Sequence, residues 1–261
     1  MNYKNNNLSI SILGAGNVAW HVTKQLFACG YVIDCIFSRN LENAQLLAKQ
    51  VDAQAINDIK MLPPSDLYLF SVKDNAYEEI TAVFPKTTAI CIHTSGSLDM
   101  NILAKCTDNY GVIYPFQSFS KEKTLDFKQV PLCVEASNAQ VENVLAEIAH
   151  QLSPTVHFVN SRQRAYLHLA GVFASNFTNA MYAVAQEILQ QNGMDFSLAL
   201  PLINETAQKA NKLYPSEAQT GPAVRNDENI ITKHATMIKD NDLKELYLLI
   251  SKIIKKQHFI L

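Results

Sequence analysis

The first residues whose type and spacing suggest a chemical role are two glycines, Gly14 and Gly16, at the end of an apolar run. Apolar residues alternate with serines over 8–13, which predicts a strand, and residues 17–30 carry the apolar spacing of a helix. Gly14 permits a sharp turn, Gly16 leaves room for a diphosphate, and Ala19 lets the helix pack closely. Phosphates would bind the free N–H groups at the helix N-terminus, where the helix dipole favours negative charge. This context favours dinucleotide binding over the alternative, an ordinary turn between a strand and a helix.

The end of the second predicted strand, in the segment YVIDCIFSRN, indicates which dinucleotide the chain binds. An acidic residue about twenty residues beyond the glycines is typical of NAD, whereas an arginine there accommodates the extra phosphate of NADP. Here the strand ends in Ser38, Arg39 and Asn40, and the acidic residue Asp34 lies earlier. Arg39 would pair with the phosphate through a charge-assisted hydrogen bond. The sequence therefore predicts NADP(H), unless Arg39 is only a solvated surface residue.

A long segment in the second half of the chain, from Ala165 to Gln186, contains no Asp, Glu, Lys or Arg. It is long enough to span a bilayer, but its polar residues would be costly in lipid, so we predict a buried central helix. At 100° per residue, one side of this helix is apolar and the opposite side carries neutral hydrogen-bonding groups. These groups are His168, Ser175, Asn179 and Gln186, with Asn176 beside them.

This uncharged polar stripe suggests either a cleft or a subunit interface. In the first case the stripe faces the nicotinamide end of the cofactor, Asn176 holds the substrate, and His168 donates or accepts a proton, because histidine titrates near neutral pH. In the second case His168 and the asparagines are satisfied polar groups of the core or of an interface. The residues by themselves do not separate these two hypotheses.

Another polar cluster follows the turn at Gly221 and Pro222, in a segment with a helix-like pattern. Arg225 can offer a planar fork to a carboxylate or carbonyl of a substrate, and Asp227 could orient it. Alternatively, Asp227 caps the helix that follows and Arg225 is a surface residue. The first hypothesis favours a carboxylated substrate.

Two kinds of pattern divide the chain between residues 160 and 161. Strand and helix patterns alternate over residues 1–160, as a doubly wound sheet requires, and residues 161–261 carry helical patterns with few strand signals. The predicted fold is therefore an α/β, Rossmann-type domain over 1–160, followed by an all-α domain over 161–261.

Composition limits the partners and the compartment. The net charge of -2 gives no electrostatic reason to expect nucleic acid or an anionic membrane as a partner. The five cysteines have no metal-type spacing, so we expect no metal site and interpret them as buried thiols of a reducing compartment. The polar N-terminus does not resemble a signal peptide, which makes the cytoplasm the expected location.

Several short segments together resemble a known family: GAGNVAWH, SVKD, HTSGS, YPFQSFS, LHLAGVFASNF and GPAVRNDENIITKH. They are similar to an uncharacterised bacterial family that joins a Rossmann-like domain to a helical domain of unknown function, and whose members are usually labelled NADP oxidoreductases. The resemblance covers nearly the whole chain. More distantly, the arrangement is similar to pyrroline-5-carboxylate reductase, 6-phosphogluconate dehydrogenase and the β-hydroxyacid dehydrogenases, whose helical domains commonly pair subunits. The resemblance therefore implies a homodimer.

The resemblance also exposes a departure on the expected catalytic helix. The β-hydroxyacid dehydrogenases place a catalytic Lys four residues before an Asn; if Asn176 fills the Asn position, Val172 stands in place of the Lys. Valine cannot transfer a proton, so His168, one turn earlier, is the candidate to replace the Lys. His93, at the end of the fifth predicted strand where related folds approach the nicotinamide, is a second acid/base candidate, unless it only hydrogen-bonds its loop.

The expected function is hydride transfer between NADP(H) and a C=O or C=N carbon of a small molecule in the cleft between the domains. The expected catalytic residues are His168, His93, Asn176, Arg225 and Asp227. The expected cofactor-binding residues are Gly14, Ala15, Gly16, Asn17, Val18, Ala19, Ser38, Arg39, Asn40, Val72, Lys73 and Thr94. A competing hypothesis, motivated by the missing Lys, is an NADP(H)-binding sensor or partner protein without turnover.

Overall fold

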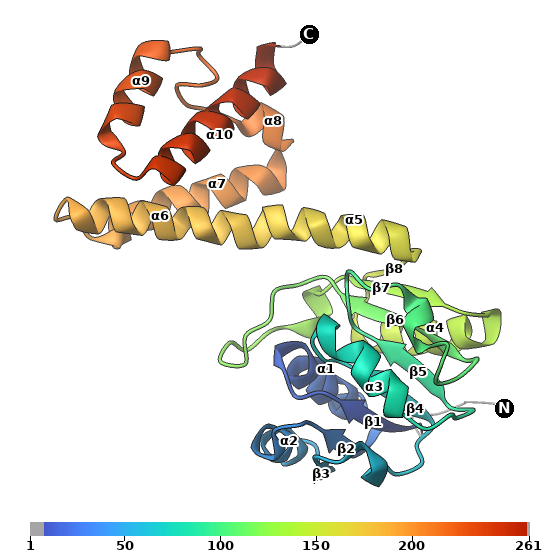
Figure 1. Cartoon of the computed structure of the whole chain (residues 1–261). Coiled ribbons are helices and arrows are strands. Elements are labelled where there is room, and N and C mark those ends of the chain that lie inside the picture. The colour runs from blue at the N-terminus through green and yellow to red at the C-terminus, as the bar shows by residue number, and fades with distance from the viewer. Residues whose placement is uncertain (1–7, 260–261) are drawn as a thin grey trace. The chain divides into compact units, whose positions relative to one another are not determined.

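The computed structural model describes residues 8–259, and contacts divide the chain into two compact units, one ending at Asn179 and the other beginning at Ala180. The first unit is built on one sheet with the strands β1 (Ser9–Leu13), β2 (Val32–Phe37), β3 (Gln54–Ile56), β4 (Leu67–Phe70), β5 (Ile90–His93), β6 (Tyr110–Pro115), β7 (Leu132–Ala136) and β8 (Val156–Phe158). Their order in the sheet is β3-β2-β1-β4-β5-β6-β7-β8, and every neighbouring pair is parallel except β6 and β7 (Figure 1). This topology confirms the predicted α/β, Rossmann-type fold.

Side-chain alternation along the central strands explains why helices cover both faces of the sheet. In β4, Leu67 and Leu69 belong to one hydrophobic cluster, whereas Tyr68 and Phe70 belong to another, because successive side chains of a strand point to opposite faces. The first cluster includes side chains of α1 (Asn17–Ala28), α2 (Leu41–Ala48) and α4 (Ala139–Leu152), and the second includes those of α3 (Tyr77–Val83).

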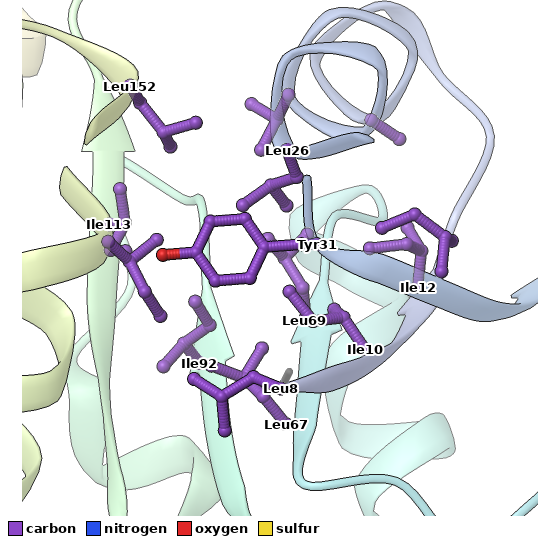
Figure 2. Packing of buried hydrophobic residues seen from close by; sticks show 14 of the residues in the cluster. Leu8, Ile10, Ile12, Leu26, Tyr31, Leu67, Leu69, Ile92, Ile113 and Leu152 are labelled. Atoms are coloured by element: carbon purple, nitrogen blue, oxygen red, sulfur yellow. The ribbon is translucent and has the colours of Figure 1, made fainter. Parts of the chain in front are cut away.

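The first of these clusters packs around the ring of Tyr31, which is 3% exposed (Figure 2). The ring lies among Leu26, Ile92 and Ile113, which come from α1, β5 and β6. Burial raises the pKa of Tyr31 to about 12, so the phenol stays neutral inside this core. The packing fixes α1 against the central strands, whose carboxyl ends carry the candidate site.

The strand order reverses between β1 and β4, so the segments that follow these two strands separate at the carboxyl edge of the sheet. In open α/β sheets, ligands bind at such a point. Gly14 lies there with a φ of +126°, and a Cβ on it would come within 2.1 Å of the carbonyl oxygen of Ser71. Only glycine fits this approach, which places the turn after β1 directly beside the end of β4.

Helices follow the sheet from Ser161 onward. They are α5 (Ser161–Gly171), the π-helix η5 (Val172–Phe177), α6 (Thr178–Gln191), the 3-10 helix η6 (Phe196–Ala199), α7 (Leu200–Lys212), α8 (Pro215–Ala218), α9 (Glu228–Met237) and α10 (Asn241–Phe259). The part of the chain that the structure describes has no strand after β8, which confirms the predicted helical C-terminal region. The predicted domain boundary between residues 160 and 161 falls at the start of α5, while contacts group α5 and η5 with the sheet. That boundary stays a prediction.

The uncharged segment from Ala165 to Gln186 is helical, as predicted, but the single chain does not bury it. Leu169, Phe173 and Phe177 are 50%, 61% and 51% exposed. The prediction of a buried central helix is therefore wrong for the chain by itself, because the described residues leave much of its apolar face uncovered. None of the described helices is both long and apolar enough to cross a membrane.

Candidate functional site

A cavity of about 380 Å³ opens at the carboxyl ends of β1, β2 and β4. Nine of the predicted cofactor-binding residues line it: Gly14, Ala15, Gly16, Asn17, Ser38, Arg39, Asn40, Val72 and Lys73. Val18, Ala19 and Thr94 do not; Ala19 is buried in the core, and the hydroxyl of Thr94 donates to Ser71 Oγ at 3.0 Å. Asn40 also caps α2, since its side chain accepts a hydrogen bond from the N–H of Asn43.

The start of α1 suits a phosphate group. Gly16 is the N-cap of this helix, and as a glycine it has no side chain with which to hydrogen-bond the first N–H groups. A Cβ on Gly16 would meet no other atom within 4 Å, so the backbone is open to the cavity. Exposed N–H groups and the positive end of the helix dipole attract anions. The open backbone at Gly16 therefore fits the pyrophosphate of a dinucleotide.

The end of β2 provides positive charge and donors to the same cavity. Arg39 forms an exposed ion pair in which its Nη1 lies 3.5 Å from Oε2 of Glu79. Asp34, the acidic residue of β2, is not among the residues that line this cavity. Its carboxylate accepts a hydrogen bond from Ser65 Oγ at 2.6 Å. The described residues that line the cavity include no carboxylate, and their cations are Arg39, Lys73 and Lys121. This composition fits an additional phosphate on the ribose better than a free ribose diol.

A second cavity of about 380 Å³ lies between the end of β6 and the helix that continues from α5 into η5. Its lining includes His168, Val172, Ser175 and Asn176 from the helix, and Tyr114, Phe116 and Phe119 from the sheet side. The hydroxyl of Tyr114 lies 3.0 Å from Nδ1 of His168. The structure thus brings two predicted catalytic residues, His168 and Asn176, to one cavity within the first unit.

A π-helix changes which residues share this face. Val172–Phe177 forms η5, in which N–H groups bond to carbonyls five residues earlier, so its turns are wider than those of an α-helix. Ser175 and Asn176 both line the cavity, whereas Asn179 and Gln186 do not. A constant step of 100° does not hold through a π-helix, so the continuation of the stripe to Asn179 and Gln186 stays a prediction.

One loop after β6 borders both cavities. Phe119 lines the second cavity and Lys121 lines the first. The loop is tied to the start of α1, where Nδ2 of Asn17 donates to the carbonyl oxygen of Phe119 at 2.9 Å, and Nε2 of His21 lies 2.9 Å from the carbonyl oxygen of Ser120. The sequence gives no signal for Lys121, because its position depends on this contact between segments far apart in the chain.

His93, the second predicted acid/base candidate, is the last residue of β5 and lines neither cavity. Its Nδ1 accepts a hydrogen bond from the N–H of Ser95 at 3.1 Å, and its buried Nε2 has no hydrogen-bond partner among the described residues. Burial, assisted by the charge of Arg164, lowers the pKa of His93 to about 3. An enclosed, neutral ring matches the alternative in which His93 hydrogen-bonds its loop.

A buried ion pair that the sequence does not single out holds the first turn of α5. The side chain of Arg164 is fully buried and pairs with the carboxylate of Glu135 from β7. Its guanidinium also donates to the carbonyl oxygens of Ser95, at 3.1 Å, and Leu98, and to the hydroxyl of Ser161. In the sequence this arginine resembles any polar residue at a helix start, because its partners in β7 and in the loop after β5 are distant in the chain.

The remaining predicted residues, Arg225 and Asp227, belong to the second unit. Arg225 is an exposed residue of a turn, and the helix α9 begins only at Glu228. Asp227 is the N-cap of α9, since its Oδ1 accepts a hydrogen bond from the N–H of Ile230 at 3.2 Å. These positions match the alternative of a helix cap and a surface arginine, and a part for Arg225 in holding a substrate stays a prediction.

Two family models match the chain: residues 9–92 match the family described as NADP oxidoreductase, coenzyme F420-dependent, and residues 130–254 match a domain of unknown function, DUF2520. No curated protein matches the chain. The solved structure of BF3122 from Bacteroides fragilis, classed as an NADP oxidoreductase, is 41% identical over 96% of this chain and 99% of that chain, with a TM-score of 0.91.

Two more distant structures share the fold. TM1727 from Thermotoga maritima is 23% identical over 95% of this chain and 98% of that chain, with a TM-score of 0.74. A pyrroline-5-carboxylate reductase from Coxiella burnetii is 17% identical over 97% of this chain and 98% of that chain, with a TM-score of 0.57. At these identities the likeness concerns the fold.

Proposed function

The chain belongs to the NADP oxidoreductase family, with a domain of the coenzyme F420-dependent type followed by a DUF2520 domain, and we propose that it transfers a hydride between NADP(H) and a small C=O or C=N substrate. The family confirms the expected cofactor, NADP(H). The observation that supports the proposal most directly is the cavity at the reversal of strand order between β1 and β4, with its open glycine backbone and its cations.

We assign the parts of the cofactor to the parts of this cavity. The backbone of Gly14 and Gly16 with the start of α1 would hold the pyrophosphate, and Ser38 and Arg39 would hold the additional phosphate. When bound, NADP(H) supplies or takes up the hydride. The loop after β6 borders this cavity and the second one, which supports the second cavity as the substrate site.

In the second cavity the chain's own side chains would hold the substrate and move a proton. Among the described residues that line it, His168 and Tyr114 are the ionisable ones. Burial raises the pKa of Tyr114 to about 12, which makes the phenol a poor proton donor near neutral pH. We therefore assign proton transfer at the substrate oxygen or nitrogen to His168, and a hydrogen bond to the same atom to Asn176.

A panel of substrates tests this function. NADPH oxidation would be followed with oxo acids and imines, and NADP reduction with hydroxy acids; we expect turnover with at least one of these classes. Tight NADPH binding without turnover across the panel would favour the second candidate, an NADP(H)-binding sensor, which Val172 in the position of the expected Lys motivates. Calorimetry that shows no binding of either pyridine coenzyme to the folded protein would contradict both.

Arg39→Ala is expected to weaken NADPH binding by about 10- to 100-fold and to leave NADH binding nearly unchanged. A hydrogen bond to a charged group is worth about 1.5–3 kcal/mol, and only NADPH carries the phosphate that Arg39 would meet. Calorimetry with both coenzymes measures the two dissociation constants.

The matched control is Glu79→Gln, which removes the partner of Arg39 and keeps the guanidinium. Because this exposed pair competes with the phosphate, NADPH binding by that variant should be equal to that of the wild type or tighter. If Arg39→Ala weakened NADH as much as NADPH, the assignment of Arg39 to the additional phosphate would be wrong.

We propose that the chain forms a homodimer through its helices. Leu169, Phe173 and Phe177 are spaced four residues apart, and each is at least half exposed. An apolar helix face of this kind is typical of an interface. Light scattering should give twice the mass of one chain, and Phe173→Asp should reduce it to one; a monomeric wild type at tens of micromolar would contradict the proposal.

A further inference from the structure

The hydrogen bond between Tyr114 and His168 joins the sheet to the helix beside the second cavity. Tyr114 comes from β6 and His168 from α5, and the phenol oxygen lies 3.0 Å from Nδ1 of the imidazole. The two rings meet edge to face, with centroids 6.0 Å apart and an interplanar angle of 70°. This contact fixes one ring nitrogen of His168 and leaves Nε2 for another partner.

We propose that Tyr114 is a positioning residue for His168: the phenol holds Nδ1, so that Nε2 is the nitrogen that exchanges a proton with the substrate. This inference rests on the proposed function. The phenol oxygen accepts the Nδ1–H of the imidazolium and also that of the neutral ring protonated on Nδ1, so the contact persists in both protonation states. A partner on one ring nitrogen sets the orientation and the proton position of the other.

The proton balance follows from this assignment. During reduction, the Nε2–H bond of the imidazolium breaks and its proton joins the oxygen or nitrogen of the substrate, while the C=O or C=N π bond breaks and carbon gains the hydride of NADPH. The ring of His168 is left neutral, with its remaining proton on Nδ1, where the oxygen of Tyr114 accepts it. Oxidation reverses each of these changes.

The surroundings of Tyr114 keep its hydroxyl protonated. Burial raises its pKa to about 12, Cys133 from β7 adds to this effect, and the charge of Arg164 from α5 opposes it. At neutral pH the hydroxyl therefore keeps its proton and acts on His168 through the hydrogen bond.

The loop after β5 backs this pair closely. A Cβ on Gly96 would lie 2.7 Å from Nδ1 of His168 and 2.8 Å from Cζ of Tyr114, so the backbone of the loop packs directly against both rings. Arg164 holds the same loop on either side of Gly96, at the carbonyl oxygens of Ser95 and Leu98. The hydrogen-bonded pair thus has a fixed backing, which is what a positioned proton donor requires.

Nitrogen NMR of the histidine rings tests the contact without substrate or cofactor. The full-length protein would carry ¹⁵N-histidine, and the ring signals of His168 would be assigned by their loss in His168→Asn. In Tyr114→Phe these signals should move toward those of a free imidazole. The matched control is Tyr110→Phe, the same change on the same strand, where the lost bond goes to Asn101. Unmoved His168 signals in Tyr114→Phe would overturn the inference, whatever the activity.

Kinetics tests the positioning role. Tyr114→Phe should lower kcat by about tenfold, the value of one hydrogen bond, with KM and the NADPH dissociation constant within about twofold of the wild type. In a His168→Ala background the same change should have no further effect on kcat, because Tyr114 acts through His168. An unchanged kcat in Tyr114→Phe, or an equal loss in both backgrounds, would overturn the inference. A wild type without any turnover would contradict the proposed function instead, and the NMR result would still stand or fall by itself.

Discussion

Arg164→Met is expected to lower the free energy of unfolding by about 3–5 kcal/mol, the cost of removing one partner of a buried ion pair. The change leaves the carboxylate of Glu135, whose side chain is 11% exposed, without its cation. It also removes the donor to the carbonyl oxygens of Ser95 and Leu98. Urea denaturation followed by circular dichroism measures the loss.

Two controls separate this effect from a general sensitivity of α5. Arg162→Met makes the same change half a turn earlier on an exposed side chain that lies over the ring of Tyr166, and it should alter the free energy of unfolding by at most about 1 kcal/mol. Adding Glu135→Gln to Arg164→Met should restore part of the lost stability, because it removes the unpaired charge. If Arg164→Met were as stable as Arg162→Met, the buried pair would not hold the loop after β5.

His168→Ala is expected to lower kcat by about 100-fold or more, the usual contribution of a general acid or base. NADPH binding should stay within about twofold of the wild type, because His168 lines the second cavity and not the one that holds the glycine turn. The measurement needs a substrate from the panel, single-turnover kinetics, and calorimetry with NADPH.

The matched control is His157→Ala, which removes an exposed imidazole from β8. This variant should keep the turnover of the wild type. If His168→Ala kept it as well, His168 would be removed from the mechanism. A loss of NADPH binding in His168→Ala equal to the loss of turnover would instead assign the histidine to the cofactor.

The sheet and the glycine turn after β1 could be predicted from local patterns. Alternating or continuous apolar runs of strand length, separated by helical spacing, are sufficient to indicate a doubly wound sheet. The pair of glycines marks the turn after β1, and Arg39 marks the end of β2, because both depend on residues close together in the chain. The exposure of the uncharged helix was not predictable in this way. An uncharged helix face does not reveal whether the residues that pack on it belong to the same chain.

The second cavity required the folded chain. His168 and Asn176 were identified as candidates from their types, but the turns of η5 decide which of their neighbours line the cavity with them. Tyr114 carries no signal in the sequence, because only the packing of α5 against the end of β6 brings its hydroxyl to His168. His93 illustrates the reverse case, since its position after an apolar strand suited catalysis while its burial leaves it neutral and enclosed.

By itself, the sequence determined the class of fold, the glycine turn and NADP(H) as the cofactor, because each depends on the types and spacing of residues close together in the chain. Only the tertiary structure decided which ionisable groups are enclosed and which line a cavity. Desolvation and hydrogen-bond partners come from segments distant in the chain, as with Arg164 held by the loop after β5 and His168 held by β6. These long-range contacts set the burial and the orientation of the groups to which we assign the proton transfer.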